Sequence, residues 1–201
     1  MKTLCMDSAH RHLVIVLAED QEMHASFEAE CWKHQSEEIF PQLIRCMEQA
    51  CWQSEDIDEV VITDGPGSYT GVRIAMSIAK VFCTTMNKPL SCLSTLQLYA
   101  GMEQDAFVML DARSQRAYCA RYHEGVLMGE ESIATLDDIR EMVAKNPSHQ
   151  LFGDCALIDQ SAKPISLCEH FISLLPKARR VENIHTLIPR YLKEKEAYKV
   201  K

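Results

Sequence analysis

Glycine, closely paired cysteines and long apolar runs are scarce in this sequence. Only 7 of its 201 residues are glycine, although 47% are hydrophobic, which excludes collagen-like and disordered chains. None of the nine cysteines has CxxC spacing to another, so we expect reduced core thiols of a cytoplasmic protein rather than a disulfide framework. The first residues lack the apolar core of a secretory signal, and no stretch approaches the roughly 20 apolar residues that a membrane span needs.

Positive charge is also in short supply. The chain has 21 lysines and arginines against 29 aspartates and glutamates, a formal net charge of −8 at pH 7. Polyanions are therefore not attracted to the molecule as a whole, although a local basic patch is not excluded. Candidate tRNA contacts are scattered, and ordinary solvated residues are the stronger interpretation of them. They are Arg73, Lys80, Arg179, Arg180 and Arg190.

Hydrophobic patterning in the first hundred residues predicts a three-stranded meander followed by alternating helices and strands. Ser36, followed by two glutamates, offers an N-cap and an acidic first turn for the first helix. The run Val60-Val61-Ile62 is too apolar for a half-exposed strand, so we expect it in a buried parallel position. The expected elements are strands at 3–7, 13–17 and 22–30, a helix from 36, a strand at 57–63, a helix to about 86 and a strand near 89–92.

The pattern begins again near residue 105. Two apolar segments at 107–111 and 117–122 repeat the opening hairpin, and Asp111 takes the place of Asp7. Strands at 125–132 and 150–154, with a helix at 136–145 between them, continue the second copy in shorter form. We therefore predict an α/β protein of two duplicated lobes, residues 1–104 and 105–201.

Three of the seven glycines lie in one turn, GPGSYTG at residues 65–71, between the apolar strand and the second helix. Both the dinucleotide-binding fingerprint and the Walker A loop require a glycine where Thr70 stands, so both motifs are excluded. What remains is a tight turn, with Gly65 and Gly67 at positive φ and Ser68 capping the helix. Its N–H groups could hold an anion, but a turn without a ligand fits equally well.

The helix behind this turn is apolar on two sides, and the helix from Ser36 also has a broad apolar surface. A helix that is apolar on two sides is buried on two sides. One side can pack on the sheet, and the other needs a neighbouring helix or another protein chain, unless the second lobe covers it. The expected partner surface consists of Ile39, Phe40, Leu43, Ile44, Met47, Val72, Ile74, Ala75, Met76, Ala79 and Cys83.

Together these features resemble the TsaB (YeaZ) family. The resemblance lies in Asp7-Ser8, GPGSYTGVR at 65–73, LDARSQRAYCARY at 110–122 and IPRYL at 188–192, and it spans most of the chain. It implies an actin-like (ASKHA, RNase H-like) duplicated fold, with two lobes of mixed sheets flanked by helices. It also implies a non-catalytic subunit that binds and activates TsaD, together with the ATPase TsaE, in forming N6-threonylcarbamoyladenosine at adenosine 37 of tRNAs that read codons beginning with A.

The resemblance further implies that tRNA is contacted only through the complex, and it leaves a homodimer through the same helices open. Where the family usually has Asp-Thr-Ser, this chain has Asp7-Ser8-Ala9, so one hydroxyl is lost. An inherited nucleotide site is therefore in doubt, and a weak contact with ATP, ADP or Mg²⁺ at the subunit boundary stays open. The residues that would make an anion or nucleotide contact are Asp7, Ser8, Gly65, Gly67, Ser68, Thr70, Gly71, Arg73 and Asp111.

Two alternatives have weaker support in the sequence. An ATP-dependent phosphotransferase of the same fold would use Asp7 and Asp111 to hold hydrated magnesium. A metallopeptidase would need an HxxxH pair, but Glu38 stands four positions after His34. No catalytic residue and no metal ligand are assigned.

Overall fold

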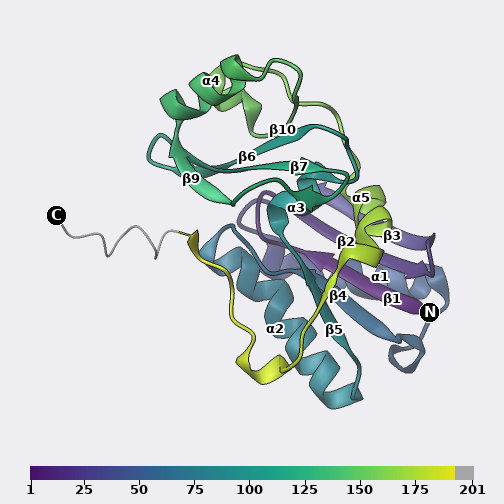
Figure 1. The fold of residues 1–201 in the computed structure, drawn as a ribbon. Helices are drawn as coiled ribbons and strands as arrows, with labels where there is room; N and C mark the ends of the chain where they lie inside the picture. The colour runs from purple at the N-terminus through teal and green to yellow at the C-terminus, as the bar shows by residue number, and fades with distance from the viewer. Residues whose placement is uncertain (193–201) are drawn as a thin grey trace.

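The computed structural model describes residues 1–192 of the 201-residue chain. Figure 1 shows two lobes, with the first sheet below and the second sheet above it, and with helices α3 and α5 where the lobes meet. The predicted α/β class is confirmed.

The first sheet has the strand order β11-β5-β4-β1-β2-β3. Strand β1 pairs antiparallel with β2 and parallel with β4. The predicted parallel position of the apolar strand β4 is confirmed, since it lies between β1 and β5. The strands are β1 (Lys2–Asp7), β2 (His12–Glu19), β3 (Glu22–Glu30), β4 (Glu59–Thr63), β5 (Leu90–Leu93) and β11 (Arg179–Arg180).

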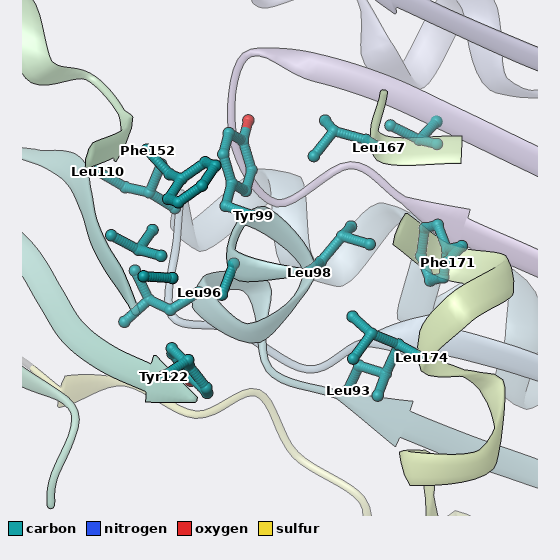
Figure 2. Packing of buried hydrophobic residues seen from close by; sticks show 14 of the residues in the cluster. Leu93, Leu96, Leu98, Tyr99, Leu110, Tyr122, Phe152, Leu167, Phe171 and Leu174 are labelled. Carbon is teal, nitrogen blue, oxygen red and sulfur yellow. The ribbon is translucent and has the colours of Figure 1, made fainter. Parts of the chain in front are cut away.

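Helices cover both faces of this sheet. On one face, α1 (Gln35–Ala50) and α2 (Tyr69–Met86) share a core with Leu4, Ile15 and Ile62 of the strands. On the other face, α3 (Thr95–Ala100) and α5 (Leu167–Leu174) pack against both lobes. Figure 2 shows Leu96 and Tyr99 of α3 on the side of Leu110 and Phe152 of the second sheet, and Leu98 on the side of Phe171 of α5. The lobes therefore share one apolar core.

The second sheet repeats the pairing of the first in shorter form. Strand β6 pairs antiparallel with β7 and parallel with β10, as β1 does with β2 and β4. The duplicated pattern predicted from the sequence is present in this pairing. Its elements are β6 (Ala106–Arg113), β7 (Arg116–His123), β8 (Val126–Leu127), β9 (Ser132–Thr135), α4 (Leu136–Lys145) and β10 (Gln150–Gly153).

Several local predictions differ from the structure. Helix α1 begins after His34, which makes no side-chain cap, so Ser36 is not the N-cap. The strand predicted at 125–132 is two short strands, β8 and β9, with a positive-φ Gly129 between them. Helices α3 and α5 were not predicted, because both are short and lie in largely apolar stretches without clear periodicity.

The end of the described chain returns to the first lobe. Helix α5 packs on β2 and β3, and β11 adds to the edge of the first sheet beside β5. Only the first part of the predicted lobe 105–201 therefore builds the second sheet, and residues 193–201 of it lie outside the described chain. A boundary at residue 104 stays a prediction.

Candidate functional site

The glycines of the 65–71 turn lie where other backbone segments approach closely. A Cβ on Gly67 would collide with the carbonyl of Ala9, and one on Gly71 with the carbonyl of Ser8. Gly65 has φ +109°, and a Cβ there would lie 2.7 Å from the carbonyl oxygen of Arg190. The predicted positive φ is confirmed for Gly65 and wrong for Gly67. The absent side chains leave room for the protein's own backbone.

Hydrogen bonds join this turn to the first hairpin. Ser68 caps α2 as predicted, because its Oγ accepts from the Gly71 N–H at 3.3 Å, while its own N–H donates to the Ala9 carbonyl at 2.8 Å. The Ser8 hydroxyl donates to the Gly71 carbonyl at 2.7 Å and accepts from the Ala75 N–H at 3.1 Å. The N–H groups of Ser68 and Gly71, which could hold a phosphate in a nucleotide-binding loop, therefore bond within the chain.

Asp7 is fully buried beneath this turn. Its Oδ1 accepts from the Ala9 N–H at 3.0 Å and from the Thr63 hydroxyl, whereas its Oδ2 has no partner. Burial raises the pKa of Asp7, although the hydrogen bonds from Thr63 and Ala9 act in the opposite direction. Asp7 does not line a cavity with Asp111, so the two carboxylates do not form a magnesium site of the kind that a phosphotransferase needs.

Residues 188–192 cross over the glycine turn. Arg190 donates to the buried carboxylate of Asp64 at 2.8 Å, to the Gly65 carbonyl at 2.8 Å and to Glu131 of the second lobe at 3.0 Å. Burial raises the pKa of Asp64, and Arg190 and Arg179 only partly oppose this. Arg190, a candidate tRNA contact in the sequence, instead ties the lobes together.

The turns of the two hairpins border a cleft of about 400 Å³ between the lobes. Among the predicted anion-contact residues, Gly67, Ser68, Thr70 and Asp111 line it, and Arg73 lies over the ring of Tyr69 at its edge. Asp7, Ser8, Gly65 and Gly71 do not line it, because they are buried behind the turn. The remaining lining residues are His10, Trp32, Tyr69, Ala112, Arg113, Tyr118 and Tyr191.

The outward surfaces of α1 and α2 form a second candidate site. We define the α1–α2 face as Phe40, Leu43, Ile44, Met47, Ile74, Ile78, Val81 and Phe82. Phe40 is 55% exposed, Ile44 57% and Val81 68%. Between the helices, a mainly apolar hollow of about 620 Å³ reaches down to the buried side chains of Leu4 and Ile57. The second lobe does not cover these side chains, so that alternative is wrong.

Six of the residues expected on this surface face the sheet instead. Their relative exposure is 3% or less, because the inward stripe of each helix packs on β1, β2 and β4. They cannot touch a partner without unfolding the lobe. They are Ile39, Val72, Ala75, Met76, Ala79 and Cys83.

Ile78, Val81 and Phe82 also lie on this face, although they are not among the residues expected there from the sequence. At 100° per residue, they lie on the opposite side of the helix from Val72 and Met76. This difference in position around the helix is the sequence signal that separates the outward stripe from the inward one. In the cleft, the sequence analysis missed Trp32, Tyr118 and Tyr191, which come from three distant segments and carry no common motif.

Within residues 1–192, no group of three or more His, Cys, Asp or Glu side chains is arranged to hold a metal ion. No helix in that same range is long and apolar enough to cross a membrane. The nine cysteines are free thiols, and most are buried. Burial raises the pKa of Cys46 and of Cys155 to about 11 in each case.

Comparison with known proteins gives consistent sequence and structural matches. Residues 15–164 match the family described as TsaD, tRNA N6-adenosine threonylcarbamoyltransferase. The tRNA threonylcarbamoyladenosine biosynthesis protein TsaB of Bacillus subtilis is 26% identical over 98% of this chain and 96% of its own length. The protein of that name from Escherichia coli K12 is 30% identical over 68% of this chain and 62% of its own length.

Solved structures support the same fold. The structure described as YeaZ from Pseudomonas aeruginosa has a TM-score of 0.74 at 18% identity, and covers 95% of this chain and 99% of its own. A structure described as an uncharacterized protein with similarity to peptidase YEAZ, also from Pseudomonas aeruginosa, has a TM-score of 0.78 at 20% identity with the same coverage. At these identities the likeness establishes the architecture alone.

Proposed function

The chain belongs to the tRNA N6-adenosine threonylcarbamoyltransferase (TsaD) family, in which it is a TsaB (YeaZ) protein, and from this we propose that it is a non-catalytic cytoplasmic subunit that binds and activates TsaD. In that role it acts with TsaD and TsaE in forming N6-threonylcarbamoyladenosine at adenosine 37 of tRNAs that read codons beginning with A. It meets tRNA as part of the assembled complex.

The observation that carries this proposal is the α1–α2 face. Two neighbouring helices present large apolar side chains to solvent around an apolar hollow. Contiguous exposed apolar surface of this kind marks a protein-binding site in soluble proteins. Because this chain matches the family described as TsaD, we expect the proposed partner to share its fold and to present an equivalent pair of helices.

The environment of Asp7 supports a non-catalytic role. A phosphotransferase of this fold needs carboxylates that reach hydrated magnesium in the cleft. Asp7 is fully buried, and its Oδ1 is occupied by Thr63 and Ala9. The geometry therefore favours a binding subunit over the phosphotransferase alternative. The metallopeptidase alternative has no arrangement of ligands in the described part of the chain to support it.

Charge substitutions on the outward face test the docking proposal. Val81→Glu and Ile44→Glu place a carboxylate on the α1–α2 face without disturbing the sheet-facing stripe. We expect about 100-fold weaker binding to purified TsaD, since burying an unpaired charge in an apolar interface costs several kcal/mol. Size-exclusion chromatography and calorimetry measure the binding, and circular dichroism checks the fold. Met76→Glu is unsuitable, because Met76 is 3% exposed and the buried carboxylate of the new glutamate would unfold the lobe.

Val126→Glu is the matched control. Val126 is 53% exposed on β8 of the second lobe, so the same chemical change is made away from the α1–α2 face. We expect this variant to bind TsaD like the unchanged protein. Unaltered binding by both Val81→Glu and Ile44→Glu would contradict the proposed interface.

A further inference from the structure

The cleft between the two hairpin turns has a lining that the docking of helices does not use. It holds four aromatic side chains from separate segments, namely Trp32, Tyr69, Tyr118 and Tyr191. Its volume of about 400 Å³ lies in the range of small-molecule sites. We propose that this cleft binds an unpaired nucleotide of an RNA strand, with Trp32 and Tyr69 as stacking surfaces and Arg113 as a phosphate contact.

Two of the four aromatic rings are exposed at the cleft, whereas Tyr118 is packed in the core. Tyr69 is 59% exposed and Trp32 is 37% exposed, although most aromatic side chains elsewhere in the protein are more buried. The rings of Tyr69 and Tyr191 are stacked at 5.3 Å, which holds Tyr69 at the edge of the cleft. Exposed aromatic rings beside a cleft bind unpaired bases by stacking, because every base offers a π face.

Guanidinium groups border the same rings. The Arg73 Cζ lies 4.0 Å from the Tyr69 ring centroid, and the Arg11 Cζ lies 5.9 Å from that of Trp32. Arg113 lines the cleft directly, and its exposed side chain follows a backbone at φ +64°. Arginine beside aromatic rings is typical of single-strand recognition, since it contacts phosphate and stacks on bases. This cluster of arginines differs in charge from the chain as a whole, which has a net charge of −8.

The carboxylates at the cleft are already engaged with groups of the chain. Asp154 lies 2.8 Å from the Nε2 of His10, accepts from the Asp111 N–H at 2.7 Å and is 3.8 Å from Arg11. Asp111 accepts from the Arg113 N–H at 2.7 Å. With Asp7 buried, the described residues that line the cleft include no pair of carboxylates for a magnesium triphosphate. A base with a phosphodiester therefore fits its lining better than ATP with magnesium does.

This RNA-binding proposal rests on the proposed function in one respect, because only the proposed function identifies the RNA strand as tRNA. The cleft is at the N-terminal end of α2 and between the lobes, whereas the α1–α2 face is on the outer side of the helices. Binding at one place can therefore be abolished while binding at the other is kept.

Tryptophan fluorescence provides a direct test on the full chain. The protein has two tryptophans, and Trp52 is only 6% exposed, so quenching by a stacked base reports on Trp32. We expect single-stranded heptanucleotide RNA to quench the emission and to bind at least about tenfold more tightly than duplex RNA of the same length. Adenosine monophosphate should compete weakly, and ATP with Mg²⁺ no better than the monophosphate.

Substitutions identify the stacking surface and the phosphate contact. Trp32→Leu keeps an apolar side chain without a stacking face and should weaken RNA binding about tenfold, measured by anisotropy of labelled RNA, whereas Trp32→Phe should retain most of it. Arg113→Glu should weaken binding and reduce its salt dependence, whereas the matched control Arg140→Glu on α4 should not. Trp32→Leu should still bind TsaD, and Ile44→Glu should still bind RNA.

Three outcomes would overturn the proposal. They are unchanged RNA affinity in both Trp32→Leu and Arg113→Glu, equal binding of duplex and single-stranded RNA, and ATP with Mg²⁺ binding more tightly than RNA. The last outcome would identify a free nucleotide as the ligand. If Ile44→Glu loses TsaD binding and retains RNA binding, both proposals are supported. If both Ile44→Glu and Val81→Glu retain TsaD binding while RNA binding is normal, the docking proposal alone is overturned.

Discussion

The two hairpins that begin the lobes have similar sequence patterns but different surroundings. Each has an aspartate near the end of its first strand: Asp7 is the last residue of β1, and Asp111 stands two residues before the end of β6. Asp7 is fully buried, whereas Asp111 is partly exposed and lines the cleft. A repeated sequence signal therefore predicts the local strand and turn but not how accessible the turn is.

The difference comes from what packs on each turn. The first turn lies under the N-terminus of α2, where Ser8 and Ala9 contact the glycine turn, and residues 188–192 cross over that turn. At the second turn, the Asp111 N–H donates to Asp154 after β10 and the Gln115 carbonyl accepts from the Leu136 N–H, and Ala112 stands where the first turn has Ser8. The first turn is thus packed against the start of α2, whereas the second turn lines the cleft.

The largest expected effect comes from adding a side chain at Gly71, where α2 packs against the first turn. Gly71→Ala places a Cβ against the Ser8 carbonyl, which is part of the backbone and cannot rotate away. We expect a loss of about 3 kcal/mol in the free energy of unfolding, because overpacking outweighs the gain of roughly 1 kcal/mol in helix propensity. Urea denaturation measures it, with exposed Thr70→Ala as control. Equal stability of the two variants would mean that the turn and the hairpin are not in close contact.

An intermediate effect should follow when the first turn is made like the second. Ser8→Ala removes a hydroxyl that donates to the Gly71 carbonyl and accepts from the Ala75 N–H. We expect a loss of about 1–2 kcal/mol in unfolding free energy, as two modest hydrogen bonds are broken in a buried place. The same removal of a hydroxyl in the second turn, Ser114→Ala, should cost less than about 1 kcal/mol, because Ser114 is exposed. Similar losses from both changes would contradict the contrast between the turns.

The smallest effect is a change in how stability depends on pH. Burial raises the pKa of Asp7 in the folded protein, against the hydrogen bonds from Thr63 and Ala9. The folded state therefore holds its proton to higher pH than the unfolded state, so the stabilisation is complete below the ordinary aspartate pKa and is lost as pH rises through the folded-state pKa. Asp7→Asn, which keeps the accepting Oδ1, should gain stability relative to the unchanged protein between pH 4 and pH 7.

Thermal unfolding across that pH range measures the change in slope. Asp159→Asn is the control, because the Asp159 side chain is 94% exposed. Parallel curves for Asp7→Asn and the unchanged protein would show that burial does not shift the titration of Asp7.

Elements with a strong local signal were predicted well. Helix α2 follows from the Ser68 cap and a continuous apolar pattern, and β4 follows from its unbroken apolar run. The short helix α3 was not predicted, since a helix of six residues has too few turns to show a period. The return of α5 and β11 to the first lobe was not predicted either, because no local pattern encodes which distant surface a segment will cover.

The candidate sites show the same division. The apolar excess on α1 and α2 was visible in the sequence, but the list of interface residues mixed the inward stripe with the outward one. Assigning each stripe required knowing which side of α2 meets the sheet. The aromatic lining of the cleft could not be found at all, because Trp32, Tyr69, Tyr118 and Tyr191 converge only after the lobes have packed together.

By itself, the sequence determined most of the longer strands and helices, the repeated hairpin, the turn at residues 65–71 and the family resemblance. These depend on interactions within a few residues or on periodicity, which the chain carries wherever it folds. Only the tertiary structure decided that Asp7 is buried while Asp111 is accessible, and that Val81 rather than Met76 faces outward. Exposure depends on which distant segments fill the space around a side chain, and here α2 and residues 188–192 fill it at one turn but not at the other.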